Sequence, residues 1–534
     1  MGFVTMLTMA ANLGVAIAQT AITVDLGTTY QTIDGFGFSQ AFGRASEFQQ
    51  LNSTTAQKEG LDLLFDTTVG AGMTIIRNRI GSGGSGDSIE PDSPGSPNAT
   101  ATYVWDDYDA GQVWLSQQAM SYGVETIYAD AWSAPGFMKT NGEESDGGYL
   151  CGTTGHTCDS GDWRQAYANF LVKYVQLYKE AGITITHLGF LNEPDYSVGY
   201  SSMLITTSDP VEVTSFVPTL YNTLQSANLT SQVKIACCDT ISWADAKTVT
   251  AALASADSIT PYIGLLTSHM YGGDPTSLIS TTLTDLPPVW MTEGADLDDA
   301  WCTTWYSSGG LCEGMTWANK IATGILSANL SAYIYWQGLE IDEPQASSYL
   351  VAVLDDATAT PSGRLWAFAM WSRFIRPGAV RLGTTGTISS VQIGAFENTD
   401  GSVIVVFTNS GSSAQSAAVS FNGFTPSTAS AWVTDNSTSV NSTSASLSGG
   451  VVTVSLPSYS VVTFDTDYFY FFQIEHLISS INADYSRFFE NEHFIIQFDY
   501  DNIGGNELRE LVRTVWRSHV DRVGMLFIRH LHKV

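Results

Sequence analysis

Basic residues are scarce in this chain. Its 534 residues include only 22 Lys and Arg against 53 Asp and Glu, which gives a formal net charge of −31. A surface of this sign repels nucleic acids and anionic membranes, so we expect neither as a partner. The charge favours solubility in an acidic exterior, and on its own it does not indicate a cationic substrate.

Long apolar runs and the common metal-binding motifs are also missing. Beyond the N-terminal segment, no run approaches the roughly 20 apolar residues that a membrane-spanning helix needs. The patterns Cys-x-x-Cys and His-Glu-x-x-His do not occur, so the sequence predicts no metal and no cofactor. Internal repeats and heptads are absent as well, which argues against a purely structural cell-wall protein.

The six cysteines indicate an oxidising compartment. They fall into three pairs along the chain: Cys151 with Cys158, Cys237 with Cys238, and Cys302 with Cys312. The first and third pairs each bracket a short loop and predict local disulfides. The adjacent pair allows either a vicinal disulfide or two reduced buried thiols, because spacing alone does not determine connectivity.

The N-terminus is similar to a secretory signal peptide. Residues 1–18 are mostly apolar and small and end in an A-x-A cleavage signature, although no Lys or Arg precedes Arg44 to form the usual positive region. Six Asn-x-Ser/Thr sequons follow, at Asn52, Asn98, Asn228, Asn329, Asn436 and Asn441. Together these features predict a secreted, extracellular glycoprotein, which we expect to be monomeric.

Strand-like and helix-like segments alternate between residues 32 and 377. Apolar residues at helical spacing over 163–181 predict one of the helices. This alternation predicts a parallel sheet, and eight such units predict an α/β fold of the TIM type, a (β/α)8 barrel. The eight predicted strands are residues 33–41, 73–81, 124–135, 185–194, 233–239, 264–271, 289–294 and 332–340.

The character of the sequence changes twice after the predicted barrel. Short strand-like segments with Gly, Ser and Asn turns predict an antiparallel β-sandwich side domain over 378–467, which the N-terminal strand within 19–31 is expected to join. Residues 468–534 then hold 7 of the 22 Lys and Arg and 5 of the 8 His. Helical spacing over 508–520 favours an accessory helical module, while the anomalous composition favours a gene-model artefact, and both interpretations stay open.

Two glutamates stand at the ends of predicted barrel strands. Glu193 follows the run Leu-Gly-Phe-Leu-Asn, and Glu293 follows Pro-Val-Trp-Met-Thr. Barrel enzymes carry their chemistry at the carboxyl ends of the strands, so both side chains are expected to face one cleft. Glycosidic bond cleavage needs two such groups, a proton donor for the leaving oxygen and a carboxylate at the sugar carbon. The alternative is structural for each residue alone, a loop carboxylate for Glu193 and a rim ion pair for Glu293.

Four segments in this order resemble glycoside hydrolase family 30: Thr32–Ala41, Trp132–Lys139, Leu191–Pro194 and Trp290–Glu293. The resemblance covers residues 21–466 and implies a (β/α)8 barrel with a closely attached β-sandwich. It also implies retention of anomeric configuration, with Glu193 as the acid/base and Glu293 as the nucleophile. The tail after Asp467 lies outside the family pattern.

Within the family, the segment Phe38–Ala45 is most similar to the fungal subfamily 7 xylanases. The resemblance implies that Arg44 binds the glucuronic acid branch of xylan, a role that suits a guanidinium because it pairs with a carboxylate through two hydrogen bonds. The alternative is an ion pair with Glu47 or another barrel acid. Further residues expected to line the cleft and bind substrate are Trp132, Asn192, His269, Tyr271 and Trp336, with barrel packing as the alternative for the aromatic ones.

The sequence as a whole therefore predicts a secreted, retaining glycoside hydrolase that cleaves β-1,4-xylan, with glucuronoxylan as the expected substrate. The first alternative is a β-1,6-glucanase or glucosylceramidase-like hydrolase of the same family, and Arg44 argues against it because those substrates carry no carboxylate. The second alternative is a catalytically inactive sugar-binding protein, against which the presence of both glutamates argues. Endo and exo action are not distinguished.

Overall fold

The computed structural model describes residues 19–83, 86–255, 261–283, 285–297, 301–341, 349–354 and 357–467, together with the backbone of 485–490 and 493–498. The predicted signal peptide and the predicted helical segment 508–520 lie outside these residues. The chain divides into two compact units, Met1–Asp467 and Tyr468–Val534. In the second unit, β21 (Tyr485–Glu490) and β22 (His493–Phe498) pair as an antiparallel hairpin.

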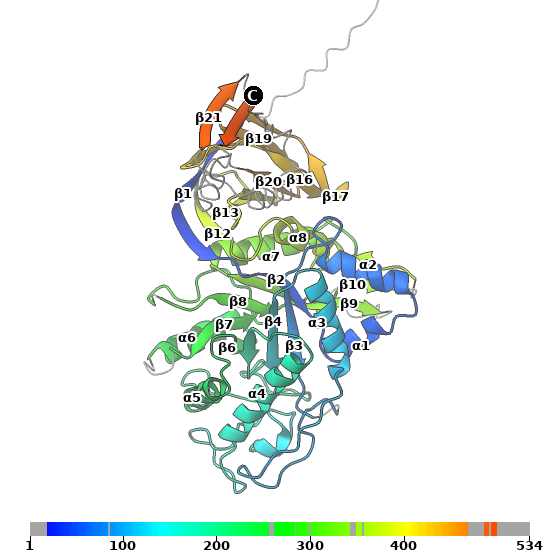
Figure 1. The fold of residues 1–534 in the computed structure, drawn as a ribbon, viewed down its shortest axis with the longest axis vertical. Helices are drawn as coiled ribbons and strands as arrows, with labels where there is room; N and C mark the ends of the chain where they lie inside the picture. The colour runs from blue at the N-terminus through cyan, green and yellow to red at the C-terminus, as the bar shows by residue number, and fades with distance from the viewer. Residues whose placement is uncertain are drawn as a thin grey trace, which may run out of the picture. The chain divides into compact units, whose positions relative to one another are not determined.

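Eight parallel strands form a closed barrel in the first unit (Figure 1). In chain order they are β2 (Gly35–Ser39), β3 (Ile75–Ile80), β4 (Thr126–Ala131), β5 (His187–Gly189), β6 (Lys234–Thr240), β7 (Ile263–His269), β8 (Val289–Glu293) and β9 (Ala332–Ile341). Because β9 pairs with both β8 and β2, the sheet has no open edge between them. The predicted barrel is confirmed, and its eight strands lie in the predicted segments apart from one residue at an end of β6, β7 and β9.

One part of the barrel sheet was not predicted. Strand β10 (Tyr349–Val353) pairs in parallel with β9, and β11 (Thr360–Pro361) continues the sheet beside it. Inside the barrel, seven buried residues form a separate cluster made only of strand side chains: Ile75, Tyr128, Ala236, Leu265, Trp290, Ala332 and Ile334. Side chains therefore fill the interior, as is usual for this fold, and leave the carboxyl ends of the strands for chemistry.

Helices follow most of the barrel strands. They are α1 (Arg44–Gln49), α2 (Thr54–Phe65), α3 (Gln112–Ser121), α4 (Arg164–Glu180), α5 (Val211–Ser226), α6 (Trp243–Ser255), α7 (Gly314–Ser327) and α8 (Gly363–Ser372), with single 3-10 turns η1 (Asp109–Gly111) and η2 (Gly136–Met138). The longest, α4, buries Tyr167, Phe170, Tyr174 and Leu177 on one face. This is the apolar stripe that predicted a helix over 163–181.

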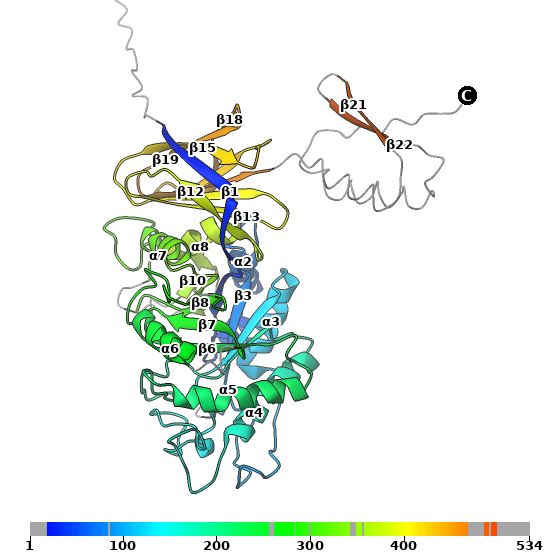
Figure 2. The ribbon, with the colours of Figure 1, turned by 90° about the vertical axis from the view of Figure 1, so that its left-hand side faces the viewer.

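The β-rich side domain of the first unit is built from ten strands. They are β1 (Thr20–Thr32), β12 (Val380–Thr385), β13 (Val391–Glu397), β14 (Val403–Asn409), β15 (Gln415–Asn422), β16 (Ser430–Asp435), β17 (Thr438–Thr443), β18 (Ala445–Ser448), β19 (Val451–Leu456) and β20 (Ser460–Thr466). Strand β1 lies between β12, to which it is antiparallel, and β15, to which it is parallel (Figure 2). The start of the described chain therefore belongs to the same sheet as its distant end.

Several contacts join this side domain to the barrel. The indole nitrogen of Trp305 donates to the carbonyl oxygen of Tyr459 at 2.7 Å, and Thr463 Oγ1 donates to the carbonyl oxygen of Met370 at 2.7 Å. The rings of Trp371 and Phe396 pack edge to face between the two parts. All three cysteine pairs are bonded, including the adjacent pair, so the disulfide alternative holds for it. No helix among the described residues has the length and hydrophobicity of a membrane-spanning segment.

Candidate active site

The two glutamates named from the sequence come together at the carboxyl end of the barrel. Glu293 is the last residue of β8, and Glu193 lies in the loop that follows β5. The backbone of Glu193 is left-handed, with a φ of 46°, and its N–H donates to the carbonyl oxygen of Asp239 at 2.8 Å. A residue with a side chain adopts this conformation only where the surroundings hold it, and such positions gather at functional sites.

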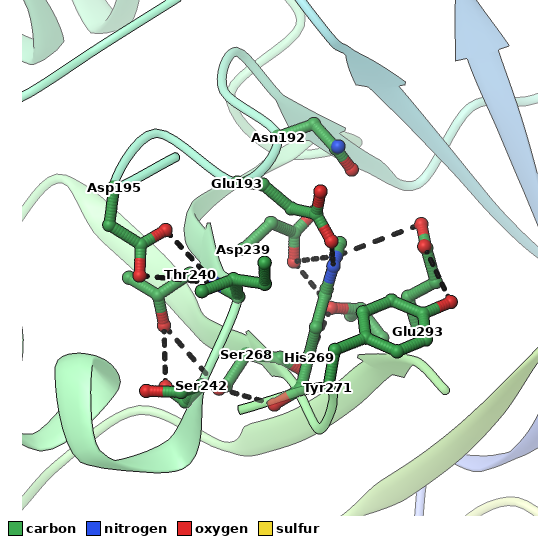
Figure 3. A network of polar contacts seen from close by, with 12 residues as sticks. Asn192, Glu193, Asp195, Asp239, Thr240, Ser242, Ser268, His269, Tyr271 and Glu293 are labelled. Atoms are coloured by element: carbon green, nitrogen blue, oxygen red, sulfur yellow. Dashed lines mark hydrogen bonds and ion pairs between the residues drawn. The ribbon is translucent and has the colours of Figure 1, made fainter. Parts of the chain in front are cut away.

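His269 stands between the two carboxylates (Figure 3). Its Nδ1 lies 3.0 Å from Glu193 Oε1, and its Nε2 lies 3.8 Å from Glu293 Oε2. One oxygen of each glutamate and one nitrogen of His269 all lie within 4.8 Å of one another. Two carboxyl groups about 5–5.5 Å apart suit a retaining reaction, since this leaves no room for a water molecule between the sugar and the second carboxylate.

Arg77, on β3, is the cation of the site. Its side chain is fully buried, and its guanidinium donates to Glu293 Oε2 at 2.5 Å, to Asp130 Oδ2 at 2.8 Å and to Asp239 Oδ2 at 3.1 Å. It also donates to Asn192 Oδ1 at 2.6 Å. A planar fork of five N–H groups is suited to holding several acceptors in fixed geometry, which a lysine ammonium does not do.

The charges around Arg77 perturb one another. Burial would raise the pKa of Asp239, but Arg77 and His269 outweigh it and hold that pKa below the ordinary value. Burial next to Asp239 raises the pKa of Asp130 well above the ordinary value, so Asp130 keeps its proton. Asp239 also accepts hydrogen bonds from Tyr128 and Thr292, which stabilise its ionised form.

The pKa values of Glu293 and His269 are both raised, for different reasons. Burial raises the pKa of Glu293, and His269 and Arg77 limit the rise. Burial would lower the pKa of His269, but Glu293, Glu193 and Asp239 together outweigh it, and its pKa is raised. Tyr271, whose pKa burial raises well above its ordinary value, keeps its proton and donates to Glu293 Oε1 at 2.9 Å. Glu193, His269 and Glu293 lie close enough together to share a metal ion. In this structure their charges and hydrogen-bonding atoms are paired with neighbouring side chains.

The two predicted tryptophans pack against each other, with Trp132 buried and Trp336 half-buried. Trp132 is 2% exposed, and the guanidinium of Arg77 covers its ring at 4.4 Å. Trp336, on β9, packs against Trp132 with ring centres 6.0 Å apart. Phe42 contacts both rings at their edges and is itself 41% exposed. Of the three side chains, Phe42 therefore has the largest exposed fraction.

Two other predicted residues have protein partners. Asn192 is almost fully buried, and its side-chain oxygen is taken by Arg77. Arg44, at the start of α1, forms ion pairs with Glu47 at 3.1 Å and with the buried Glu340 at 3.3 Å. About a quarter of the Arg44 side chain remains exposed. The ion pair with Glu47 considered from the sequence is present.

Several residues of the site were not found from the sequence. They are Phe42, Arg77, Asp130, Tyr200 and Asp239, of which Tyr200 donates to Glu193 Oε2 at 3.2 Å. A signal was available for Arg77, since it lies in the fully buried strand Ile75–Ile80, where an ionised side chain requires partners. Asp239 is the last residue but one of β6, near the same end of the barrel as Glu293.

Comparisons with known proteins agree with this geometry. Residues 19–278 match the model of O-glycosyl hydrolase family 30, and residues 378–464 match the family 30 β-sandwich domain. The catalytic domain of family 30 xylanase C from Talaromyces cellulolyticus superposes with a TM-score of 0.79 and is 53% identical, over 84% of this chain and 100% of that one.

More distant relatives differ in their named substrates. Endo-1,6-beta-D-glucanase BGN16.3 from Trichoderma harzianum is 31% identical over 32% of this chain, and the match spans 36% of that protein. Glucuronoxylanase XynC from Bacillus subtilis is 22% identical over 84% of this chain and 92% of its own length. The two family models and the full-length match to a solved member place this chain in glycoside hydrolase family 30.

Proposed function

We propose that this protein is a retaining xylanase that cleaves β-1,4-xylan by double displacement. The observation that supports the mechanism best is the approach of Glu193 and Glu293 on either side of His269, within 4.8 Å of one another. The observation that supports the substrate is the 53% identity to a xylanase over the whole of its catalytic domain. Resemblance to fungal subfamily 7 is part of the same proposal.

In the first step Glu293 attacks the anomeric carbon while Glu193 gives its proton to the glycosidic oxygen. The bond from carbon to the leaving oxygen breaks, and a covalent glycosyl-enzyme forms. Arg77 and Tyr271 hold the Glu293 carboxylate toward the sugar. In the second step Glu193, now ionised, takes a proton from water, and the water oxygen displaces Glu293 from the sugar carbon. Configuration at that carbon is retained after two inversions.

Arg44 is the proposed contact for the glucuronic acid branch of the substrate. Its side chain is partly exposed, and its guanidinium already pairs with two carboxylates, Glu47 and Glu340. A substrate carboxylate would exchange for the more exposed Glu47 with little change in charge. A bidentate pair of this kind contributes roughly 1.5–3 kcal/mol when well aligned.

A second function is tested as well, because three curated relatives are endo-1,6-beta-D-glucanases. The neutral glucan offers no group that Arg44 would recognise. Purified enzyme is therefore assayed on glucuronoxylan, on an arabinoxylan without glucuronic acid and on β-1,6-glucan, beside Arg44→Ala and a control, Arg164→Ala, in which another partly exposed ion-paired arginine is removed.

The expected result is acidic xylo-oligosaccharides from the native enzyme. The kcat/KM of Arg44→Ala is expected to fall about tenfold on glucuronoxylan and to change little on arabinoxylan. The kcat/KM of the control is expected to stay unchanged on both substrates. Cleavage of the glucan alone would contradict the substrate, and an equal loss on both xylans would contradict the role of Arg44.

A further inference from the structure

Exposed aromatic rings gather at the mouth of the site. Among the described residues, the strongly exposed aromatic side chains are Tyr30, Phe42, Tyr196 and Tyr200, at 52%, 41%, 51% and 45%. Tyr30 lies on β1 in the side domain. The other three lie near Glu193, since Phe42 and Tyr200 have ring centres 6.4 Å apart and Tyr196 and Tyr200 belong to the loop that carries Glu193. Apolar ring surface left open beside a catalytic carboxyl group is suited to contact with a ligand.

Tyr200 lies on one particular side of Glu193. Oxygen Oε1 of Glu193 faces His269, which also faces Glu293, whereas Oε2 accepts the hydrogen bond of Tyr200 at 3.2 Å. Burial is the main cause that raises the pKa of Tyr200, and the charges of Glu193 and Glu293 raise it further. The hydroxyl therefore remains a donor. With Glu293 as the nucleophile, its sugar would lie on the side of His269, and the sugar that departs would lie on the side of Oε2, beside Tyr200.

The loop that carries the two tyrosines is firmly held. Ser201, next to Tyr200, accepts from Arg79 at 2.7 Å and donates to Glu144 at 2.6 Å. The N–H of Ser202 donates to the carbonyl oxygen of Glu144 at 2.9 Å, and the buried ammonium of Lys139 donates to the carbonyl oxygen of Ser202 at 2.6 Å. These bonds tie the loop after β5 to strand β3 and to the loop after β4. A ring presented on a fixed loop loses little conformational freedom when a ligand stacks on it.

We propose that Tyr200 and Tyr196 form a binding site for the leaving part of the substrate, in which Tyr200 stacks on the first sugar beyond the cleaved bond and Tyr196 on a following one. The ligand class is a neutral β-linked chain of pyranose rings, which offers flat C–H faces to an aromatic ring. A site on this side of the cleaved bond favours cleavage within a chain. The inference rests on the proposed function, because it takes Glu193 as the acid for the leaving oxygen.

The test compares a sugar leaving group with one that is not a sugar. The kcat/KM values on xylohexaose and on 4-nitrophenyl β-xylobioside are measured for the native enzyme, Tyr196→Ala, Tyr200→Ala, Tyr200→Phe and the control Tyr30→Ala. For each alanine variant at the site, the loss on xylohexaose is expected to exceed the loss on the aryl glycoside by about tenfold. Tyr200→Phe keeps the ring face and is expected to keep most of this preference, and Tyr30→Ala is expected to match the native enzyme.

The outcomes separate the two proposals. If the native enzyme cleaves xylohexaose and the ratio of the two kcat/KM values is the same in all variants, the leaving-group site is refuted and the xylanase function stands. If the native enzyme cleaves no xylo-oligosaccharide, the proposed function fails, and the same ratio measured on β-1,6-linked gluco-oligosaccharides decides the site. Tyr196 is half exposed and lies outside the hydrophobic clusters of the described residues, so its alanine variant is expected to fold.

Discussion

Replacing Arg77 by glutamine removes a guanidinium that lies among the buried acids of the site. The native guanidinium is fully buried and bonded to Glu293, Asp130 and Asp239. Glutamine keeps some hydrogen-bonding capacity and removes the charge. Breaking a buried ion pair from one side costs about 3–5 kcal/mol, because the remaining charge stays in a medium that solvates it poorly. The free energy of unfolding of a domain is about 5–15 kcal/mol in total, so we expect a large loss of stability at neutral pH.

The loss should depend on pH in a defined direction. In the native protein Arg77 holds the pKa of Asp239 below its unfolded value and opposes the rise that burial imposes on the pKa of Glu293. Without Arg77, the folded pKa values of both acids rise, because burial is opposed by fewer groups. The unfavourable charge is then fully present above those folded pKa values and is relieved by proton uptake as the pH falls. The variant should therefore lose more stability at pH 7 than at about pH 4.

Urea unfolding at the two pH values measures this difference. The matched control is Arg164→Gln, since Arg164 pairs with Asp162 at the surface, with 31% and 52% of the two side chains exposed. Exposed pairs contribute about 0–1 kcal/mol, so the control should lose little at either pH. If Arg77→Gln costs no more than the control at pH 7, or costs more at pH 4 than at pH 7, the reasoning about the buried acids is wrong.

Two further predictions concern single carboxyl groups. Glu90 is 1% exposed, and neither of its carboxylate oxygens has a hydrogen-bond partner among the described residues. Burial raises its pKa from 4.5 to about 7, so the native protein loses stability as the pH rises through this window, and Glu90→Gln should gain up to about 3 kcal/mol more at pH 8 than at pH 4.5 in urea unfolding; equal effects at both pH values would contradict this. Glu293 must be ionised to attack, so kcat/KM should fall as the pH drops through its raised pKa. Tyr271→Phe removes a hydrogen bond that lowers this pKa, so the acidic limb of the pH–rate profile should move to higher pH, and a limb that moves down would refute the assignment.

Local patterns were sufficient for much of the architecture. Each barrel strand is a short apolar segment with turn or helix signals around it, and burial on both faces leaves a readable signature in the sequence. The strands β10 and β11 were not predicted, because β11 has only two residues and β10 begins only eight residues after the end of β9. The place of β1 was expected, whereas its pairing with both β12 and β15 required the folded chain.

The residues of the site also fall into those that the sequence identified and those that only the structure revealed. Glu193 and Glu293 were identifiable because each ends an apolar run at the barrel rim, where this fold displays its reactive groups. Trp132 and Asn192 were predicted to bind substrate, which stays a prediction, and the structure adds that Arg77 contacts both. Tyr200 and Phe42 carried no signal of their own, since an exposed aromatic residue in a loop is ordinary until the loop is seen beside a carboxylate.

The sequence by itself determined the barrel, the presence of a β-rich side domain and the pair of glutamates, because these depend on periodicity and on position along single strands. Only the tertiary structure decided which groups surround those glutamates. Arg77, Asp239 and His269 come from three different strands, 77 to 269 in the chain, and meet through barrel closure. Their pKa values follow from burial and from a few contacts of about 3 Å, and the steep dependence of such interactions on distance and solvent is invisible in the order of residues.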